Sequence, residues 1–291
     1  MTLYQPKADT AEDFYRLSRY KRQIDWLKAP CYDAGLTTLL NEFKKDNERE
    51  LLLELLGNVA HYKISDRIES ISTLVEYIEK LNPKTTLIVA TAKDSESDGS
   101  KAWQYFFKFF LAQSRQWNES CLKPTLVSSY GALSQKRKES YKDVIIFDDF
   151  IGSGNTMVTK VNEFFNQLST RNIKPPTVQI FALAGMEFGI NHIKRELNLN
   201  VVCPVSLKKG ISEQHSNTDE ISHKIKLMES MELSLKEHYE CGVFESCSLG
   251  YGQSEALYQV QFTNCSNNVF PIFWVGPKGK GRYRNTLFYR L

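Results

Sequence analysis

The spacing of apolar residues changes once along the chain, close to residue 82. Before that point apolar side chains recur every three or four positions, which is the spacing of one face of a helix. A clear example is the set Ile68, Ile71, Leu74, Val75 and Ile78. Ser65 with Asp66 supplies a helix start signal, and Asn82-Pro83 interrupts the pattern. We therefore predict an N-terminal helical extension over residues 1–81, packed on the remainder of the chain.

After residue 82, short apolar runs alternate with stretches of helical spacing. The predicted strands are 86–91, 125–128, 144–147, 178–182 and 201–205. The predicted helices are 101–113, 156–168, 187–197 and about 219–240. Nearly continuous apolar strands are typical of a parallel sheet covered on both faces, and their alternation with helices indicates right-handed crossovers. The predicted fold class is α/β, with a central, mainly parallel sheet flanked by helices over residues 82–291.

Composition narrows the class of protein. Of the 291 residues, 42% are apolar and 24% are charged, as in ordinary soluble globular proteins. A net charge of only +3 argues against a protein that mainly coats nucleic acid. No apolar run approaches the roughly 18 residues of a membrane span, and the N-terminus lacks the apolar core of a signal peptide. The six cysteines form no CxxC pair. We expect a cytoplasmic protein with reduced thiols and no membrane partner.

One segment combines a strand, an acid pair and a glycine-containing turn: Val144–Thr156, VIIFDDFIGSGNT. Ligands of open α/β sheets bind beyond the carboxyl ends of the strands, where this turn would lie. Glycine at 152 and 154 lets backbone N–H groups approach a phosphate, and the helix that follows points its positive end at the same anion. Because Asp148 and Asp149 would repel a phosphate, we expect them to face hydroxyl groups or a cation. A ribose carrying a 5-phosphate meets both requirements.

Other interpretations of this segment fit less well. A Walker loop requires a lysine that is absent here, and a dinucleotide fingerprint would require glycine where the chain has Met157. A phosphoaspartyl hydrolase uses acids at a strand end, but a glycine loop does not normally follow them so closely. An ordinary strand–turn–helix with an acidic turn is the remaining alternative.

The segment resembles the PRPP-binding motif of type I phosphoribosyltransferases, in which a hydrophobic strand ends in two acids and a phosphate loop. The resemblance implies that Asp148 and Asp149 contact the ribose 2- and 3-hydroxyls. It implies that they contribute to the Mg²⁺ site only indirectly. It implies that PRPP or a nucleotide is the ligand, with its 5-phosphate held by Gly152, Ser153, Gly154, Asn155 and Thr156. Magnesium suits such a site because it binds substrate phosphates and water.

Three further groups of residues follow from the same resemblance. Ser129 and Tyr130 resemble the Ser-Tyr loop of purine enzymes that closes over pyrophosphate, although Tyr130 is equally compatible with simple packing. Lys93 and Ser100 flank the loop after strand 86–91 and are candidates for binding the pyrophosphate, with a solvated acidic loop as the favoured alternative. Finally, Lys208, Lys209 and His215 follow the fifth strand, where purine enzymes contact the base, and solvated loop charges are the alternative.

One departure bears on catalysis. Purine enzymes of this type usually carry an aspartate three places after the second acid, as a base for the ring nitrogen, and this chain has Gly152 there. The chain therefore uses another base, relies on the leaving group, or binds without turnover as a sensor.

The wider chain resembles the phosphoribosyltransferase-like effector domains of bacterial conflict systems. The resemblance rests on the helical extension, the SGNT loop and the aromatic segments 264–274 and 287–290. It implies an effector restrained by partners, either an NTPase or a retron reverse transcriptase with its non-coding RNA, and it leaves oligomerisation open. The basic and aromatic tail 277–290 keeps a nucleic-acid-binding module as a further alternative.

Overall fold

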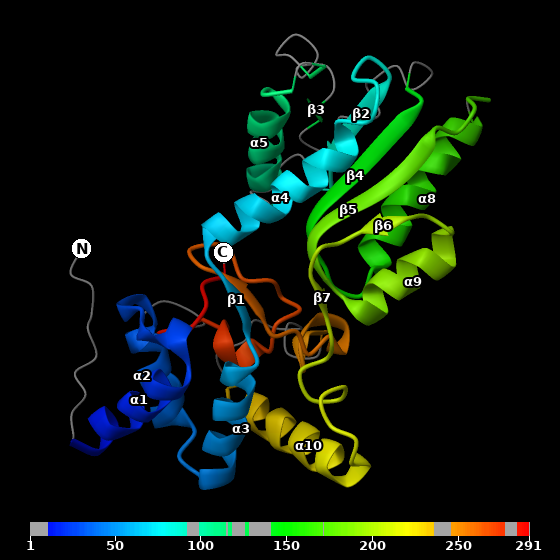
Figure 1. Ribbon diagram of the computed structural model, residues 1–291. Helices are drawn as coiled ribbons and strands as arrows, with labels where there is room; N and C mark the ends of the chain where they lie inside the picture. Colours follow the sequence, from blue (N-terminus) through cyan, green and yellow to red (C-terminus); the bar gives the residue numbers. More distant parts are fainter. Residues whose placement is uncertain are drawn as a thin grey trace. The chain divides into compact units, whose positions relative to one another are not determined.

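The computed structural model describes residues 11–91, 99–114, 116–117, 126–127, 141–170, 172–235, 246–276 and 284–290 (Figure 1). The chain divides into two compact units: Met1–Tyr62 together with Lys208–Leu291, here called the terminal unit, and Lys63–Leu207, here called the sheet unit. The division at residue 81 stays a prediction.

The sheet unit contains a parallel sheet. Its strands are β2 (Thr86–Ala90), β3 (Leu126–Val127), β4 (Asp143–Ile151), β5 (Thr177–Met186), β6 (Val201–Val202) and β7 (Ser206–Leu207). Their order is β3-β2-β4-β5-β6, β7 also pairs with β5, and every pairing is parallel. The predicted α/β fold class is confirmed. Counted along the chain, the five strands of the main path lie in the order 2-1-3-4-5, which reverses direction between β2 and β4.

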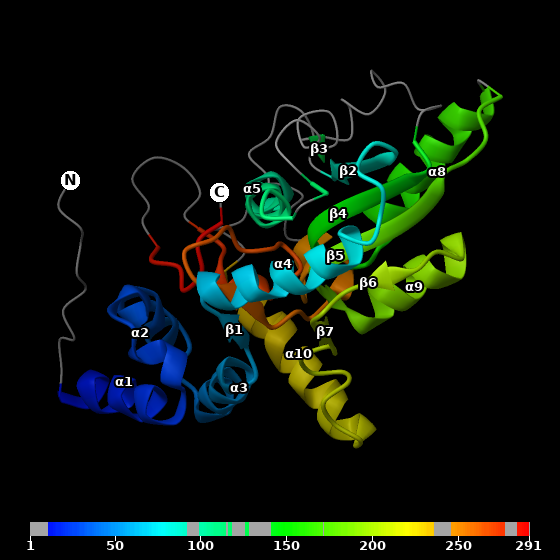
Figure 2. The same ribbon diagram turned by 45° about the horizontal axis from the view of Figure 1, so that its top comes forward.

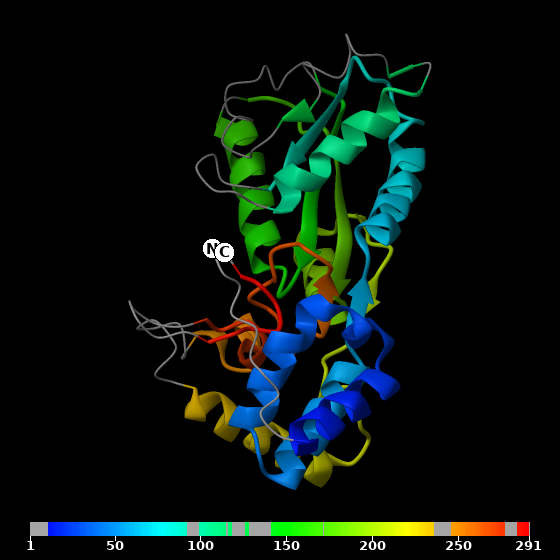
Figure 3. The same cartoon turned by 90° about the vertical axis from the view of Figure 1, so that its left-hand side faces the viewer.

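Helices cover both faces of this sheet (Figure 3). They are α4 (Ile64–Ile78), α5 (Gly99–Leu111), α8 (Asn155–Thr170) and α9 (Glu187–Leu197). Val144 and Ile146 of β4 belong to a buried cluster with apolar residues of α8 and α9. Phe147 points to the other face, where its ring meets that of Phe107 on α5 edge to face at 4.7 Å. The continuous apolar run of β4 therefore contributes side chains to the core on each face of the sheet, as the sequence pattern predicted.

Two of the element boundaries that differ from the sequence prediction have a clear structural cause. Strand β4 continues through the acid pair to Ile151, because β5 keeps pairing alongside it, with Asp148 opposite Ala182 and Ile151 opposite Gly185. The strand predicted over 201–205 shortens to β6, and Pro204, which has no N–H to donate, separates it from β7. Helix α4 starts at Ile64, where Asp66 accepts the backbone N–H of Lys63 at 2.8 Å.

The terminal unit joins the two ends of the chain. It contains α1 (Ala11–Gln23), α2 (Asp33–Glu42), α3 (Asp46–Gly57), β1 (Ala60–Tyr62), α10 (Thr218–Ser234) and β8 (Tyr258–Val260), with 3-10 turns at Asp25–Lys28, Pro30–Tyr32, Tyr251–Gln253 and Pro271–Phe273. Strand β1 pairs in parallel with β8, and α10 lies beside α3 (Figure 2). Residues 270–274, the apolar end of the aromatic segment 264–274, are buried here. They belong to the core of this unit.

Two properties of the described residues bear on the sequence expectations. No helix among them is both long enough and apolar enough to cross a bilayer. Cys31, Cys203, Cys247 and Cys265 are free thiols. Burial raises the pKa of Cys203 to about 11, so this thiol is a weak nucleophile at neutral pH.

Candidate functional site

The acid pair lies at the point where the sheet changes direction. Open α/β sheets bind ligands at such a switch point, beyond the carboxyl ends of the strands. Here that point is the end of β2 and β4, and Asp148 and Asp149 are half-buried in the last part of β4. The backbone N–H of Asp149 donates to Asp148 Oδ1 at 3.0 Å, so this carboxylate has a fixed local orientation. The structure thus places both predicted acids at the expected ligand position.

The turn after β4 depends on two glycines. Gly154 has a φ of +82°, in the left-handed region that side chains rarely adopt. Gly189 of α9 lies against the same turn: a Cβ there would approach the carbonyl oxygen of Gly152 to 1.9 Å. The turn therefore rests directly on the backbone of α9. Only glycine at 189 permits that approach, and nothing in the sequence pattern predicted it.

The first turn of α8 is suited to an anion. Ser153 Oγ accepts the backbone N–H of Asn155 at 3.4 Å, and Val158 N–H begins the helical ladder by donating to Gly154 O at 3.0 Å. Asn155 and Thr156 are exposed, whereas Met157 is buried and anchors the helix in the core. No acidic residue occupies this first turn, so the positive end of the helix is not neutralised there. A phosphate at this end would meet both the dipole and the first-turn N–H groups.

A residue that the sequence did not single out completes this region. Lys160 of α8 donates from Nζ to the backbone carbonyl of Thr91, directly after β2. It stands four positions after Thr156, and this spacing on one helix face was the available signal. The site therefore combines two carboxylates, a helix N-terminus and an ammonium group.

Several predicted residues lie outside the described parts of the chain. These are Lys93, Ser129 and Tyr130. Ser100 falls in the first turn of α5, and its side chain is not among those described. Their contact with pyrophosphate stays a prediction.

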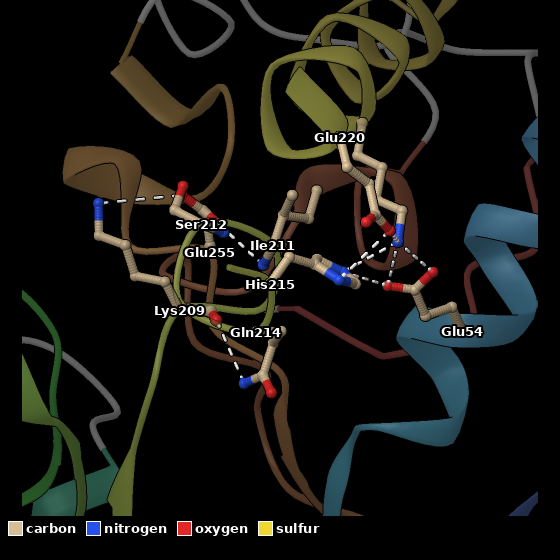
Figure 4. Close-up of polar contacts among 9 residues, drawn as sticks. Glu54, Lys209, Ile211, Ser212, Gln214, His215, Glu220 and Glu255 are labelled. Atoms are coloured by element: carbon tan, nitrogen blue, oxygen red, sulfur yellow. Dashed lines mark hydrogen bonds and ion pairs between the residues drawn. The ribbon is translucent and has the colours of Figure 1, made fainter. Parts of the chain in front are cut away.

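The candidates for base recognition belong to the terminal unit (Figure 4). Lys209 lies in a tight turn, with its backbone N–H donating to Glu213 at 2.8 Å and its Nζ 3.9 Å from the buried Glu255. Lys208 is exposed. Base contact by Lys208 and Lys209 stays a prediction.

His215 forms part of an ionic cluster that ties α10 to α3 (Figure 4). Its Nε2 lies 2.8 Å from Glu54 Oε1 and its Nδ1 lies 3.3 Å from Glu220 Oε1. Lys224 contacts both carboxylates at 2.7 Å. The hydrogen bond from Lys224 lowers the pKa of Glu220 below its ordinary value. These contacts give His215 a structural role within its unit.

The described part of the tail is also structural. Arg284 is buried and forms a forked ion pair with Glu42, at 2.9 Å from Nη2, and donates to the carbonyl of Val275. Arg290 donates to the carbonyl of Cys265 at 2.7 Å and lies over the ring of Trp274. These two cations of the proposed nucleic-acid tail are thus used inside the fold; Lys278, Lys280 and Arg282 lie outside the described residues.

The donor set at the acid pair fits a magnesium ion. Mg²⁺ is usually held by one or two carboxylates together with substrate phosphates and water, and Asp148 with Asp149 would supply carboxylate oxygens just before the glycine turn. Across the described residues, no three His, Cys, Asp or Glu side chains are grouped to hold a metal ion by themselves. A magnesium ion at the acid pair would therefore need oxygen ligands from a bound phosphate in addition to the carboxylates.

Comparison with known proteins agrees with this arrangement. The PRTase-CE family matches residues 36–290, which covers most of both compact units. No curated protein matches the chain. The match, the 2-1-3-4-5 sheet and the acid pair before a glycine turn together describe a phosphoribosyltransferase-like domain. The chain belongs to the PRTase-CE family.

Proposed function

We propose that this domain binds PRPP or a nucleotide through a ribose 5-phosphate cradle at the end of β4. One observation carries the proposal: Asp148 and Asp149 directly precede a glycine turn that opens helix α8 at the switch point of the sheet. The carboxylates accept hydrogen bonds from the ribose hydroxyls, and the turn from Gly152 to Thr156 binds the 5-phosphate. The negatively charged carboxylates suit the hydroxyl donors of the ribose, and the positive end of α8 suits the negatively charged 5-phosphate.

The reaction that follows from this cradle is transfer at ribose C1. The bond between C1 and a pyrophosphate oxygen breaks, pyrophosphate leaves with the bonding electrons, and an acceptor atom forms the new bond at C1. Asp148 and Asp149 hold the ring so that C1 stays aligned while positive charge develops on it. A bound Mg²⁺ would offset negative charge on the pyrophosphate. Because Gly152 carries no side chain to take a proton, the acceptor must be one that needs no base at this position.

The setting we propose for this activity is bacterial anti-phage defence, with the domain acting as an effector under the control of a partner. The support is the resemblance of the helical extension, the SGNT loop and the aromatic C-terminal segments to effector domains of conflict systems. The partner would be an NTPase, or a reverse transcriptase with its non-coding RNA.

A second function is favoured by one specific residue. Gly152 in place of an aspartate suits a non-catalytic sensor, which binds PRPP or a nucleotide and signals its presence to a partner. Release of pyrophosphate from PRPP and Mg²⁺, with and without added bases, separates the two functions. Turnover supports the transferase, whereas tight binding without release supports the sensor.

The test of the cradle itself is calorimetric titration with PRPP in the presence of Mg²⁺. We expect Asp148→Asn combined with Asp149→Asn to weaken binding by roughly 100-fold or more, because each carboxylate loses charge-assisted hydrogen bonds to the ribose. Asp143→Asn is the matched control, since Asp143 is a half-buried aspartate at the opposite end of the same strand. Unchanged binding by the double variant would falsify the cradle.

A further inference from the structure

A cavity of about 310 Å³ lies in the terminal unit. Its lining joins residues 31–32, the turn after β8 at residues 259–264 and the C-terminal residues 287–289. Most of this lining is apolar, and Leu287 and Phe288 are buried within it. Sites for small molecules span roughly 300–1,000 Å³, so a cavity at the lower end of that range has room for a single ring system.

One wall of this cavity is formed by packed aromatic rings. Tyr32 and Phe288 meet edge to face at 6.5 Å, and the Tyr32 hydroxyl shares a hydrogen bond of 2.7 Å with Nε2 of His61. Trp26 stacks on the His61 ring at 4.9 Å. These contacts hold the wall in place before a ligand enters, so little conformational freedom is lost on binding.

The cavity also offers an acceptor for a hydrogen bond. Gln259 lines it, is only 4% exposed, and donates from Nε2 to the carbonyls of Val260 and Thr263 at 2.6 and 3.1 Å. Those two carbonyls fix which end of the side-chain amide is the nitrogen. No donor reaches the remaining oxygen, Oε1, from the residues that the structure describes. A ligand in this cavity therefore gains by bringing an N–H or O–H group.

Two aromatic side chains of the lining have most of their surface in solvent. Phe262 is 77% exposed and Tyr289 is 69% exposed. The backbone of Phe262 has a φ of +63°, a conformation that is costly for a bulky residue and that marks functional positions. A ligand that only fills the cavity would leave both rings in water, whereas a polypeptide segment would cover them. The surface is therefore suited to a protein partner.

A second copy of this chain does not offer a ring with a free N–H donor of the indole type. The chain has four tryptophans, and Trp103, Trp117 and Trp274 are buried. Trp26 is half-buried, and its indole N–H donates to the carbonyl of Leu56 at 3.3 Å. An indole in the cavity must therefore come from a different protein.

We propose that this cavity is a docking site for a tryptophan side chain of a partner protein. Indole has one N–H donor and no acceptor, so the Gln259 oxygen alone satisfies it. Its two fused rings match the apolar lining, and tryptophan is enriched among the residues that contribute most to binding at interfaces. The proposal uses no residue of the ribose 5-phosphate cradle, so its test requires no PRPP.

The experiment titrates three probes into the full chain and follows them by ligand-detected NMR. The first is an acetylated pentapeptide with tryptophan at its centre and glycine elsewhere. The second has 3-benzothienylalanine in place of tryptophan, a side chain of nearly the same shape without an N–H group, and the third is free indole. We expect the benzothienyl peptide to bind about 10-fold more weakly than the tryptophan peptide, because it leaves the Gln259 oxygen without a donor.

Three variants locate the site. Gln259→Met removes the acceptor and should bind the two peptides equally, which separates loss of the hydrogen bond from general damage to the cavity. Phe262→Gly, which the positive φ permits, should weaken the tryptophan peptide by about 5-fold and free indole little. Tyr15→Ser is the matched control, since Tyr15 is 66% exposed on α1 of the same unit and lies outside the lining. It should bind all three probes as the unaltered chain does.

Four results would overturn the proposal. Equal affinity of the unaltered chain for the two peptides would show that Gln259 accepts no hydrogen bond from the ring. Free indole that binds as tightly as the peptide would assign the cavity to a small molecule. A dimer in analytical ultracentrifugation that Phe262→Gly abolishes would assign the surface to a second copy of the chain. Absence of binding by every probe would leave the cavity without a docking role.

Discussion

Two of the turns with left-handed backbone, the one before α8 and the segment 249–255, achieve it by different means. The turn before α8 uses Gly154, at a φ of +82°, and it packs on a second glycine, Gly189. The segment 249–255 of the terminal unit has Gly250 and Gly252 in the same region, and it also places three residues other than glycine there, at φ values of 58°, 53° and 49°: Leu249, Gln253 and Glu255. In the turn before α8, glycine adopts the left-handed region without strain. At Leu249, Gln253 and Glu255 the backbone is strained, and the surrounding structure must hold it in place.

Buried carboxylates hold the second turn. Glu232 of α10 accepts the backbone N–H of Leu249 at 3.1 Å and the hydroxyl of Ser248 at 2.8 Å. Glu255 accepts the backbone N–H groups of Ile211 and Ser212 at 2.9 and 2.7 Å. Both carboxylates are almost fully buried. The turn before α8 is thus held by glycines at 154 and 189, whereas the segment 249–255 also needs buried carboxylates that join it to residues far away in the chain.

The largest expected effect comes from breaking the glycine contact. Gly189→Ala adds a Cβ at 1.9 Å from the carbonyl oxygen of Gly152, so the turn must move away from α9. Displacement of a binding turn by about an ångström costs on the order of 100-fold, and we expect a loss of PRPP affinity of that size by calorimetry.

The control for this change is Gly57→Ala. Gly57 is the last residue of α3, and a Cβ there would meet nothing within 4 Å. Its PRPP affinity should equal that of the unaltered chain. Equal affinity in Gly189→Ala as well would show that the turn does not need its contact with α9.

The two turns also differ in how far the sequence predicts them. The glycine turn was predicted because its requirement is local: a strand, two acids and glycines at fixed spacing lie within thirteen consecutive residues. The same locality explains why the parallel sheet and most of its helices were predicted from apolar spacing. The contact with Gly189 and the reach of Lys160 to Thr91 were missed, because each joins residues that are at least thirty positions apart. Only the fold brings such pairs together.

The terminal unit was harder to predict for the same reason. Its strand pair joins Ala60–Tyr62 to Tyr258–Val260, and the ion pair of Arg284 with Glu42 spans a similar separation. Arg284 was assigned to a basic tail, since sequence alone cannot show that a charged residue is buried against a partner. Positive φ values at Leu249 and Gln253 give no sequence signal either.

A second, smaller effect is the pH dependence of stability that Glu232 contributes. Burial raises the pKa of Glu232 to about 7 from its ordinary 4.5, and nearby Glu229 adds to the rise while its hydrogen bonds to Ser248 and Leu249 oppose it. The folded state therefore holds this proton more tightly than the unfolded state. The resulting stabilisation is complete below about pH 4.5 and is lost as the pH rises through about 7.

Glu232→Gln should remove that pH dependence. Between pH 5.5 and 8 we expect the free energy of unfolding of the unaltered chain to fall by about 2 kcal/mol more than that of the variant. Urea unfolding at the two pH values measures this difference. Glu163→Gln is the control, because Glu163 is an exposed glutamate on α8 in the sheet unit and should leave the pH dependence unchanged. A parallel fall in the unaltered chain and in Glu232→Gln would show that Glu232 does not bind the proton.

The smallest expected effect is on stability, and it tests the backbone strain at one residue of the segment 249–255. Gln253 is exposed, and its backbone N–H donates to the carbonyl of Gly250 at 2.8 Å, a contact that any residue can make. Gln253→Gly relieves left-handed strain of about 1–2 kcal/mol and adds chain entropy to the unfolded state worth about 0.5–1 kcal/mol. We therefore expect a net gain in the free energy of unfolding of up to about 1 kcal/mol, measured by urea unfolding. Gln23→Gly, at the exposed end of α1 where φ is not positive, should instead lose stability. If both variants lose stability equally, the strain at Gln253 is not stored in its backbone, and the two turns differ in sequence but not in energy.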